Sequence, residues 1–176
     1  MRIFLTGFMG SGKTHVGRRL AARIGLPFVD LDEWIEEMTG MTITEIFDRH
    51  GTDYFRELET RYLRDFDSLK RVVIACGGGT PIHHDNMAWM NTHGITIYLD
   101  VETKELVKRL ANQTRHRPLL TKQKDLAAYI KRTKAERADT YLMAKMHLSL
   151  DGQNLDVAQI IADRLNLTEY QTDGDS

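Results

Sequence analysis

The sequence has almost no cysteine, no excess of either charge and no long apolar run, and each shortage excludes a class of protein. One cysteine, Cys76, rules out an internal disulfide framework and is typical of a reducing compartment. With 24 Lys and Arg residues against 25 Asp and Glu, the formal net charge of −1 provides no basic field that would attract nucleic acid. No apolar run approaches the roughly 18 residues of a membrane span. Glycines interrupt the first apolar residues so early that we expect no signal peptide. These features predict a cytoplasmic protein that binds neither nucleic acid nor membranes.

The length favours one domain. A chain of this size buries roughly 70% of its unfolded surface when it folds as one unit. We expect that domain to span residues 1–167 and to be a monomer, because no surface pattern demands an oligomer. Residues 168–176 are acidic, and we expect them to form a disordered tail.

Short runs rich in β-branched residues alternate with helical patterns along the chain. Thr42 and Glu45 have capping-box spacing, so a helix is expected to begin there and to end at Gly51. The alternation predicts an α/β fold, a parallel sheet flanked by helices with right-handed crossovers. The expected strands span residues 3–6, 27–31, 71–76, 95–99 and, more weakly, 146–150.

A polar segment, residues 112–125, interrupts this alternation. It contains Pro118 and separates two helical patterns. A polar insertion of that length inside a domain is either a functional lid or a disordered loop.

The strongest motif is a phosphate-binding loop, GFMGSGKT at residues 7–14, which matches G-x-x-x-x-G-K-[ST] between a strand and a helix. Its glycines allow the main-chain N–H groups of Gly10, Ser11 and Gly12 to point at an anion, next to a helix N-terminus. In such loops the lysine, here Lys13, reaches the β- and γ-phosphates, and the hydroxyl of Thr14 binds Mg²⁺. The motif predicts a nucleotide site.

The choice of nucleotide follows from a missing motif. A GTPase needs an N/T-K-x-D sequence that selects guanine, and neither residues 121–124 nor residues 133–136 complete it. The sequence therefore favours an adenine nucleotide.

Five separated motifs resemble those of the shikimate kinase family, in the same order and at the same spacings. They are GFMGSGKT at 7–14, FVDLD at 28–32, Phe47…Gly51…Phe55-Arg56…Glu59, the glycine triplet at 77–79, and RPLL at 117–120. The resemblance covers about residues 1–167. It implies a five-stranded P-loop fold of the nucleoside-monophosphate-kinase type with a mobile lid. It also implies transfer of phosphate from ATP, with Mg²⁺, to the 3-hydroxyl of shikimate.

The resemblance also implies roles on the substrate side. Asp32 would hold the substrate hydroxyls and could accept a proton, although from the sequence alone it is equally well the N-cap of the next helix. Arg56 and Arg137 would bind the substrate carboxylate, because guanidinium matches its two oxygens. The glycine triplet, Gly77, Gly78 and Gly79, would present main-chain N–H groups to the same ligand. Glu59, three residues after Arg56, would orient that arginine; taken singly such a pair is more often a solvated one, but the surrounding sequence favours the orienting role.

Further roles concern the nucleotide. By the same resemblance, Arg117 in the lid would counter charge on the transferring phosphoryl group, and Arg109 would lie against adenine. Asp30 would belong to the Mg²⁺ shell through water. His15 stands where the family usually has a hydroxyl, but its main-chain N–H would still reach the α-phosphate.

Two other functions remain open from the sequence. One is a related P-loop kinase for another sugar acid such as gluconate, and the other is a nucleotide-binding protein without turnover. Departures from the family pattern at Thr52, Asp139 and Thr140 affect the assignment of Arg137 more than that of Arg56.

Overall fold

The protein is described by a computed structural model that covers residues 1–111, 125–151 and 155–172. Five parallel strands form one sheet in the order β2-β3-β1-β4-β5. They are β1 (Arg2–Thr6), β2 (Phe28–Asp30), β3 (Val72–Ala75), β4 (Ile95–Val101) and β5 (Met146–Leu150). All five lie where the sequence predicts strands, so the predicted fold class is confirmed.

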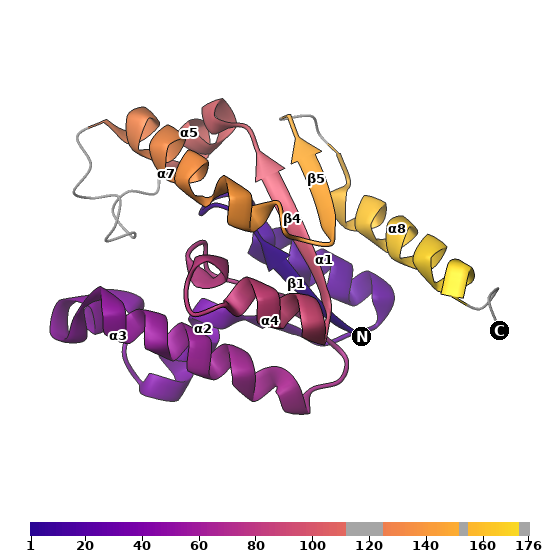
Figure 1. The fold of residues 1–176 in the computed structure, drawn as a ribbon, viewed down its shortest axis with the longest axis horizontal. Helices are drawn as coiled ribbons and strands as arrows, with labels where there is room; N and C mark the ends of the chain where they lie inside the picture. The colour runs from indigo at the N-terminus through magenta and orange to yellow at the C-terminus, as the bar shows by residue number, and fades with distance from the viewer. Residues whose placement is uncertain (112–124, 152–154, 173–176) are drawn as a thin grey trace.

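Successive side chains of a strand point to opposite faces of the sheet. Helices cover both faces (Figure 1). Ile3 and Leu5 of β1 join a core with α1 (Lys13–Ile24) and α8 (Val157–Thr172). Phe4 joins the opposite core with α2 (Leu31–Thr39), α3 (Ile43–Asp65) and α4 (Asn86–His93). A third apolar cluster, at one end of the sheet, packs α5 (Thr103–Ala111) against α7 (Leu126–Tyr141). Two short 3₁₀ turns, η1 (Phe66–Ser68) and η2 (Thr80–Ile82), complete the described elements.

The carboxyl ends of three strands are level. Leu5 of β1 and Asp30 of β2 are both paired with Ala75 of β3. The segments that follow these strands are therefore neighbours, and these segments are the phosphate loop, the start of α2 and the glycine triplet. Ligands of open parallel sheets bind at this edge.

The helix boundaries test several local predictions. The capping box is confirmed, because the Thr42 hydroxyl accepts from Glu45 N and the Glu45 carboxylate accepts from Thr42 N. At Gly51, φ is 83°, which breaks the helical geometry inside α3, but helix resumes directly afterwards. The last helix continues to Thr172, so residues 168–172 of the predicted tail lie in α8, while 173–176 lie outside the described residues.

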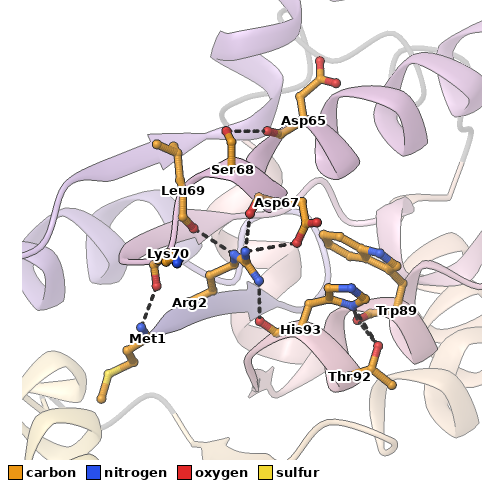
Figure 2. Close-up of polar contacts among 10 residues, drawn as sticks. All are labelled: Met1, Arg2, Asp65, Asp67, Ser68, Leu69, Lys70, Trp89, Thr92 and His93. Atoms are coloured by element: carbon orange, nitrogen blue, oxygen red, sulfur yellow. Dashed lines mark hydrogen bonds and ion pairs between the residues drawn. The ribbon is translucent and has the colours of Figure 1, made fainter.

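At the amino edge of the sheet, the side chain of Arg2 binds two neighbouring segments through hydrogen bonds and an ion pair (Figure 2). Its Nε donates to the carbonyl of Leu69 at 2.8 Å and its Nη1 to the carbonyl of His93 at 3.1 Å. Its Nη2 forms an ion pair with Asp67 at 3.0 Å. The amine of Met1 donates to the carbonyl of Lys70 at 2.6 Å. These contacts join β1 to the segment before β3 and to the end of α4.

Among the described helices, none is long and apolar enough to cross a membrane.

Candidate active site

The phosphate loop connects β1 to α1 through glycines in the left-handed region. The φ angles are 143° at Gly7, 78° at Gly10 and 92° at Gly12. A Cβ at Gly7 would lie only 2.7 Å from the carbonyl oxygen of Leu99, so both space and backbone geometry require glycine there. Gly12 directly precedes the first residue of α1. The loop therefore wraps in front of a helix N-terminus, where anions are stabilised.

Lys13 is folded back over its own loop. Its Nζ donates to the carbonyls of Gly7 at 2.8 Å and Phe8 at 2.9 Å, and to the hydroxyl of Ser11 at 3.4 Å. The residue is only 9% exposed. The structure thus holds a buried cation inside the loop that the sequence predicts to bind phosphate.

Asp30 connects the loop to α2. One of its oxygens, Oδ2, accepts from the Thr14 hydroxyl at 2.6 Å. The other, Oδ1, accepts from the main-chain N–H groups of Asp32 at 3.0 Å and Glu33 at 3.4 Å, so Asp30 is the N-cap of α2. The alternative interpretation of Asp32 as the N-cap is wrong, because the strand ends at Asp30 and Asp32 lies in the first helical turn.

The loop, Asp30 and Asp32 line one cavity of about 630 Å³. The predicted site residues in its wall also include His15, Gly77, Gly78 and Arg109. The cavity continues along a second group of residues that the sequence analysis did not single out. They lie on α1, at the end of β5 and at the start of α8: Arg19, Leu150, Leu155, Asp156, Val157 and Ala158. Their position after a fifth parallel strand, at the edge where ligands bind, was a signal that could have identified them.

Arg109 lies against the phosphate loop from the end of α5. Its Nη1 donates to the carbonyl of Gly10 at 3.2 Å, and its Nε donates to Glu105 at 2.8 Å. The ion pair with Glu105 fixes one side of the guanidinium, so the group stays at the wall of the cavity.

The glycine triplet provides the space in which the acidic and basic side chains meet. A Cβ at Gly79 would lie 2.5 Å from Arg56 Nη1. A Cβ at Gly77 would lie 2.6 Å from Glu59 Oε1 and 3.1 Å from Asp32 Oδ1. Both substitutions would collide with groups of the site, so the triplet leaves room for side chains of α2 and α3 at the end of β3.

Arg56 and Glu59 form a buried ion pair on α3, with side chains 8% and 1% exposed. The interpretation of this pair as a solvated one is therefore wrong. Burial raises the pKa of the Glu59 carboxyl, and the Arg56 guanidinium opposes that shift. The Thr80 hydroxyl donates to Glu59 Oε1 at 2.6 Å. Asn86 Nδ2 in turn donates to the Thr80 carbonyl at 2.9 Å. The sequence analysis missed Thr80 and Asn86.

Arg137 approaches the triplet from α7. Its guanidinium lies 5.7 Å from the ring centre of Phe8 in the phosphate loop, and its Nη1 would be 3.6 Å from a Cβ at Gly78. This Nη1 is buried, and within the described residues no side chain or carbonyl accepts from it. Neither Arg137 nor Arg56 lines the cavity, so the structure brings both arginines to the triplet but not to the cavity wall. Arg117 lies outside the described residues.

A parallel α/β sheet, a phosphate loop at its carboxyl edge and a cavity that joins this loop to acidic residues are the features of a P-loop nucleotide-binding protein. The family profile described as shikimate kinase matches residues 9–166. A shikimate kinase of Bacteroides fragilis is 44% identical over 146 residues, 82% of this chain and 82% of its own. The chain belongs to the shikimate kinase family.

Solved structures agree with this assignment. The shikimate kinase from Acinetobacter baumannii in complex with shikimate superposes with a TM-score of 0.88 at 34% identity, covering 96% of this chain and 93% of that one. The crystal structure of shikimate kinase from Bacteroides thetaiotaomicron gives a TM-score of 0.86 at 36% identity, covering 96% and 98%. The predicted family and its activity, an ATP-dependent kinase, are thereby confirmed.

Proposed function

We propose that the protein transfers the γ-phosphate of ATP to the 3-hydroxyl of shikimate, giving shikimate 3-phosphate and ADP, with Mg²⁺ on the nucleotide. One arrangement above all supports the proposal. The Asp32 carboxylate and the buried Arg56–Glu59 pair both adjoin the glycine triplet, beside the cavity that the phosphate loop lines. A hydroxylated acid has the two groups that such a site would recognise, namely a hydroxyl and a carboxylate.

In the nucleotide half, the residues supply positive charge and main-chain donors. Lys13 would exchange the carbonyls of its loop for oxygens of the β- and γ-phosphates. The N–H groups of residues 10–15 would bind the phosphates, and Arg109 would lie beside the base. Little covalent chemistry is needed from the protein, because phosphoryl transfer depends mainly on positioning and charge stabilisation.

Thr14 and Asp30 fit a Mg²⁺ ion, which supplies charge neutralisation on the phosphates when bound. Both offer the oxygen ligands that this ion prefers. The Thr14 hydroxyl donates its proton to Asp30, so its lone pairs are left for a metal, while Asp30 would act through water. No group of three or more acidic, histidine or cysteine side chains suited to a metal occurs in the described part of the chain.

In the acceptor half, Asp32 would orient the reacting hydroxyl and accept its proton. It lines the cavity together with Lys13, so an attacking oxygen held by Asp32 would face the γ-phosphate. Arg56, oriented by Glu59, would bind the carboxylate with two parallel N–H donors, and Arg137 would bind it from the other side of the triplet. N–H groups of the triplet itself would complete this contact.

Arg117 completes the proposal by resemblance alone. From the segment 112–125 it would counter negative charge on the transferring phosphoryl group. An arginine in that role is worth on the order of 10³-fold in kcat, so Arg117→Ala should slow turnover by that factor without a matching loss of ATP affinity.

The function is tested by ADP release from the purified protein with ATP, Mg²⁺ and either shikimate, gluconate or no acceptor. We expect rapid release with shikimate alone. Phosphorus NMR of the product should show phosphate on the 3-hydroxyl. Faster turnover of gluconate would favour the sister kinases. Absence of turnover despite tight ATP binding would favour a nucleotide-binding protein without catalysis.

We also propose that one domain, residues 1–167, works as a cytoplasmic monomer, where ATP is available. Light scattering at working concentration would give a mass near 20.2 kDa for a monomer.

A further inference from the structure

The last residue of α7, Tyr141, makes a contact with the glycine triplet that the mechanism above does not use. Its side chain is fully buried, and its hydroxyl donates to the carbonyl oxygen of Gly78 at 2.6 Å. Burial raises the pKa of this hydroxyl, so it keeps its proton and remains a donor at neutral pH. The carbonyl of Gly78 is therefore held in one direction from α7.

Gly78 lies where three parts of the site meet. A Cβ at this position would be 3.1 Å from the main-chain nitrogen of Met9 in the phosphate loop and 3.6 Å from Arg137 Nη1. Arg137 precedes Tyr141 by four residues on α7, so both side chains lie on the same face of that helix. The hydroxyl and the guanidinium thus reach the same glycine from one helix face.

The direction of the Gly78 carbonyl also determines the direction of the next N–H group. No peptide bond in the described residues is cis, and in a trans peptide the C=O of one residue and the N–H of the next point in opposite directions. The N–H of Gly79 therefore points away from Tyr141. Gly79 is the glycine that packs on the Arg56 guanidinium. A rotation of the Gly78–Gly79 peptide would therefore change the direction of the Gly79 N–H, a main-chain donor on the substrate side.

The ring of Tyr141 is itself held by a stack of aromatic rings. Tyr98 of β4 stacks on it with ring centres 4.9 Å apart and planes at 23°, and His147 of β5 stacks on Tyr98 at 5.0 Å and 16°. Lys134 joins α7 to the end of β4. Its Nζ forms an ion pair with Asp100 at 2.7 Å and donates to the carbonyl of Val101 at 2.6 Å. The Tyr141 hydroxyl is therefore presented from a position that the sheet determines.

We propose that Tyr141 is a positioning residue for the acid substrate, whose hydroxyl sets the orientation of the Gly78–Gly79 peptide and keeps it in register with Arg137. The inference rests on the proposed function, because it concerns the same acceptor site. It assigns to α7 a second contribution besides Arg137. It also predicts a larger effect on the acid than on the nucleotide, because the Tyr141 hydroxyl bonds to the glycine triplet and not to the phosphate loop itself.

The test compares Tyr141→Phe with Tyr98→Phe. Both variants keep the aromatic stack and remove one hydroxyl, but the Tyr98 hydroxyl donates to Asp100 at 3.0 Å and not to the triplet. We expect Tyr141→Phe to raise KM for shikimate about 3- to 10-fold, the effect of one net hydrogen bond, while KM for ATP changes less than about 2-fold. Tyr98→Phe should leave both KM values within about 2-fold of wild type.

Thermal melts and calorimetric titration of shikimate into the ADP-bound protein complete the experiment. ADP stabilises the folded state by mass action, so binding can be measured even if Tyr141→Phe is less stable. If both variants melt earlier and bind shikimate as wild type does, the Tyr141 hydroxyl has only a structural role and the inference is overturned. If wild type itself neither binds nor phosphorylates shikimate, the proposed function fails instead, which the same titration shows before any variant is examined.

Discussion

At the scale of single residues, Asp30 divides one carboxylate between two tasks. One oxygen caps α2, and the other accepts from the Thr14 hydroxyl. Asparagine is as good an N-cap as aspartate, so Asp30→Asn should keep the helix while it removes the negative charge next to the proposed metal.

We therefore expect Asp30→Asn to weaken the apparent affinity for Mg²⁺ about 10- to 100-fold, as other losses of a ligand's supporting group do. Initial rates against free Mg²⁺ at saturating substrates would measure this shift. Glu33→Gln is a matched control, because Glu33 lies in the same helical turn but does not line the cavity. Its carboxylate pairs with Arg18 at 2.9 Å. An unchanged Mg²⁺ dependence in Asp30→Asn would contradict a metal at this position.

Arg56 carries the second prediction at this scale. Loss of one partner of a buried charge pair costs on the order of 2–5 kcal/mol, so Arg56→Ala should weaken shikimate binding at least about 30-fold and leave ATP binding nearly unchanged. The shikimate methyl ester sharpens the test, since it keeps the hydroxyls and lacks the charge. Wild type should discriminate strongly against the ester in kcat/KM, and Arg56→Ala should do so far less.

The matched control for Arg56 is Arg49→Ala, which removes an exposed arginine from the same helix. Its only described ion pair, with Glu45, is 3.6 Å long and at the surface. This variant should retain the preference of wild type for the acid. Equal acid-to-ester ratios in Arg56→Ala and wild type would mean that Arg56 does not bind the carboxylate.

At the scale of elements, Asp156 attaches α8 to α1. Its carboxylate pairs with Arg23 at 2.8 Å and Arg19 at 3.1 Å, and it accepts from the main-chain N–H of Gln159 at 3.2 Å, as an N-cap does. These contacts, that with Arg23 first, lower the pKa of Asp156 to about 2. Because Asp156 and Arg19 also line the cavity, the attachment shapes one of its walls.

The pH dependence of stability should report this attachment. A carboxyl whose pKa is lowered by folding stabilises the folded state above its unfolded value, about 3.9, and loses that contribution as pH falls toward the folded value. Asp156→Asn should therefore have a lower melting temperature than wild type at pH 5–7. This difference in melting temperature, the gap between the two proteins, should shrink as pH falls from about 4 toward 2. Asparagine still caps the helix, so the gap reports the charge. A gap that persists unchanged at low pH would contradict this account. Asp163→Asn, on the same helix, should show a smaller gap.

At the scale of the whole molecule, the two edges of the sheet have different roles. The candidate active site lies at the carboxyl edge, whereas Arg2 joins segments 67 and 91 residues away at the amino edge (Figure 2). Its side chain is only 14% exposed; the hydrogen bond to the His93 carbonyl is partly buried, whereas that to the Leu69 carbonyl lies at the surface.

Arg2→Met should consequently lower the free energy of unfolding by about 2 kcal/mol, because the carbonyls of Leu69 and His93 lose a charged donor. Urea denaturation would measure the loss. Steady-state kinetics at 25 °C should be unchanged, since Leu69, His93 and Asp67, the described hydrogen-bond and ion-pair partners of the Arg2 side chain, do not line the cavity. Arg71→Met, an exposed arginine in the same region, is the control and should leave the unfolding curve in place. A change in KM without a loss of stability would show that the two edges are coupled.

Most of the fold could be predicted from the sequence, because the strands are short runs of β-branched and apolar residues such as the wholly buried Val72–Ala75. The choice between Asp30 and Asp32 as N-cap could not, since both residue types cap well and only the end of β2 decides. Nor could the contacts of Thr80 with Glu59 and of Asn86 with Thr60, because these partners are 21 and 26 residues away and meet only when α3 packs on the triplet. The family resemblance implied that Arg56 and Arg137 belong to the site, but it could not show that both lie at the glycine triplet and outside the cavity wall.

Cys76, the one thiol of the chain, is 2% exposed, and burial raises its pKa well above the usual range. Its sulfur is therefore protonated and inaccessible, so maleimide and iodoacetamide reagents should leave the folded protein unlabelled. A cysteine introduced at an exposed position, for instance in place of Arg132 on α7 or Arg49 on α3, would then be the sole target for a fluorophore or a spin label. Distances between these two helices could thus be measured spectroscopically, with and without substrates, without first replacing Cys76.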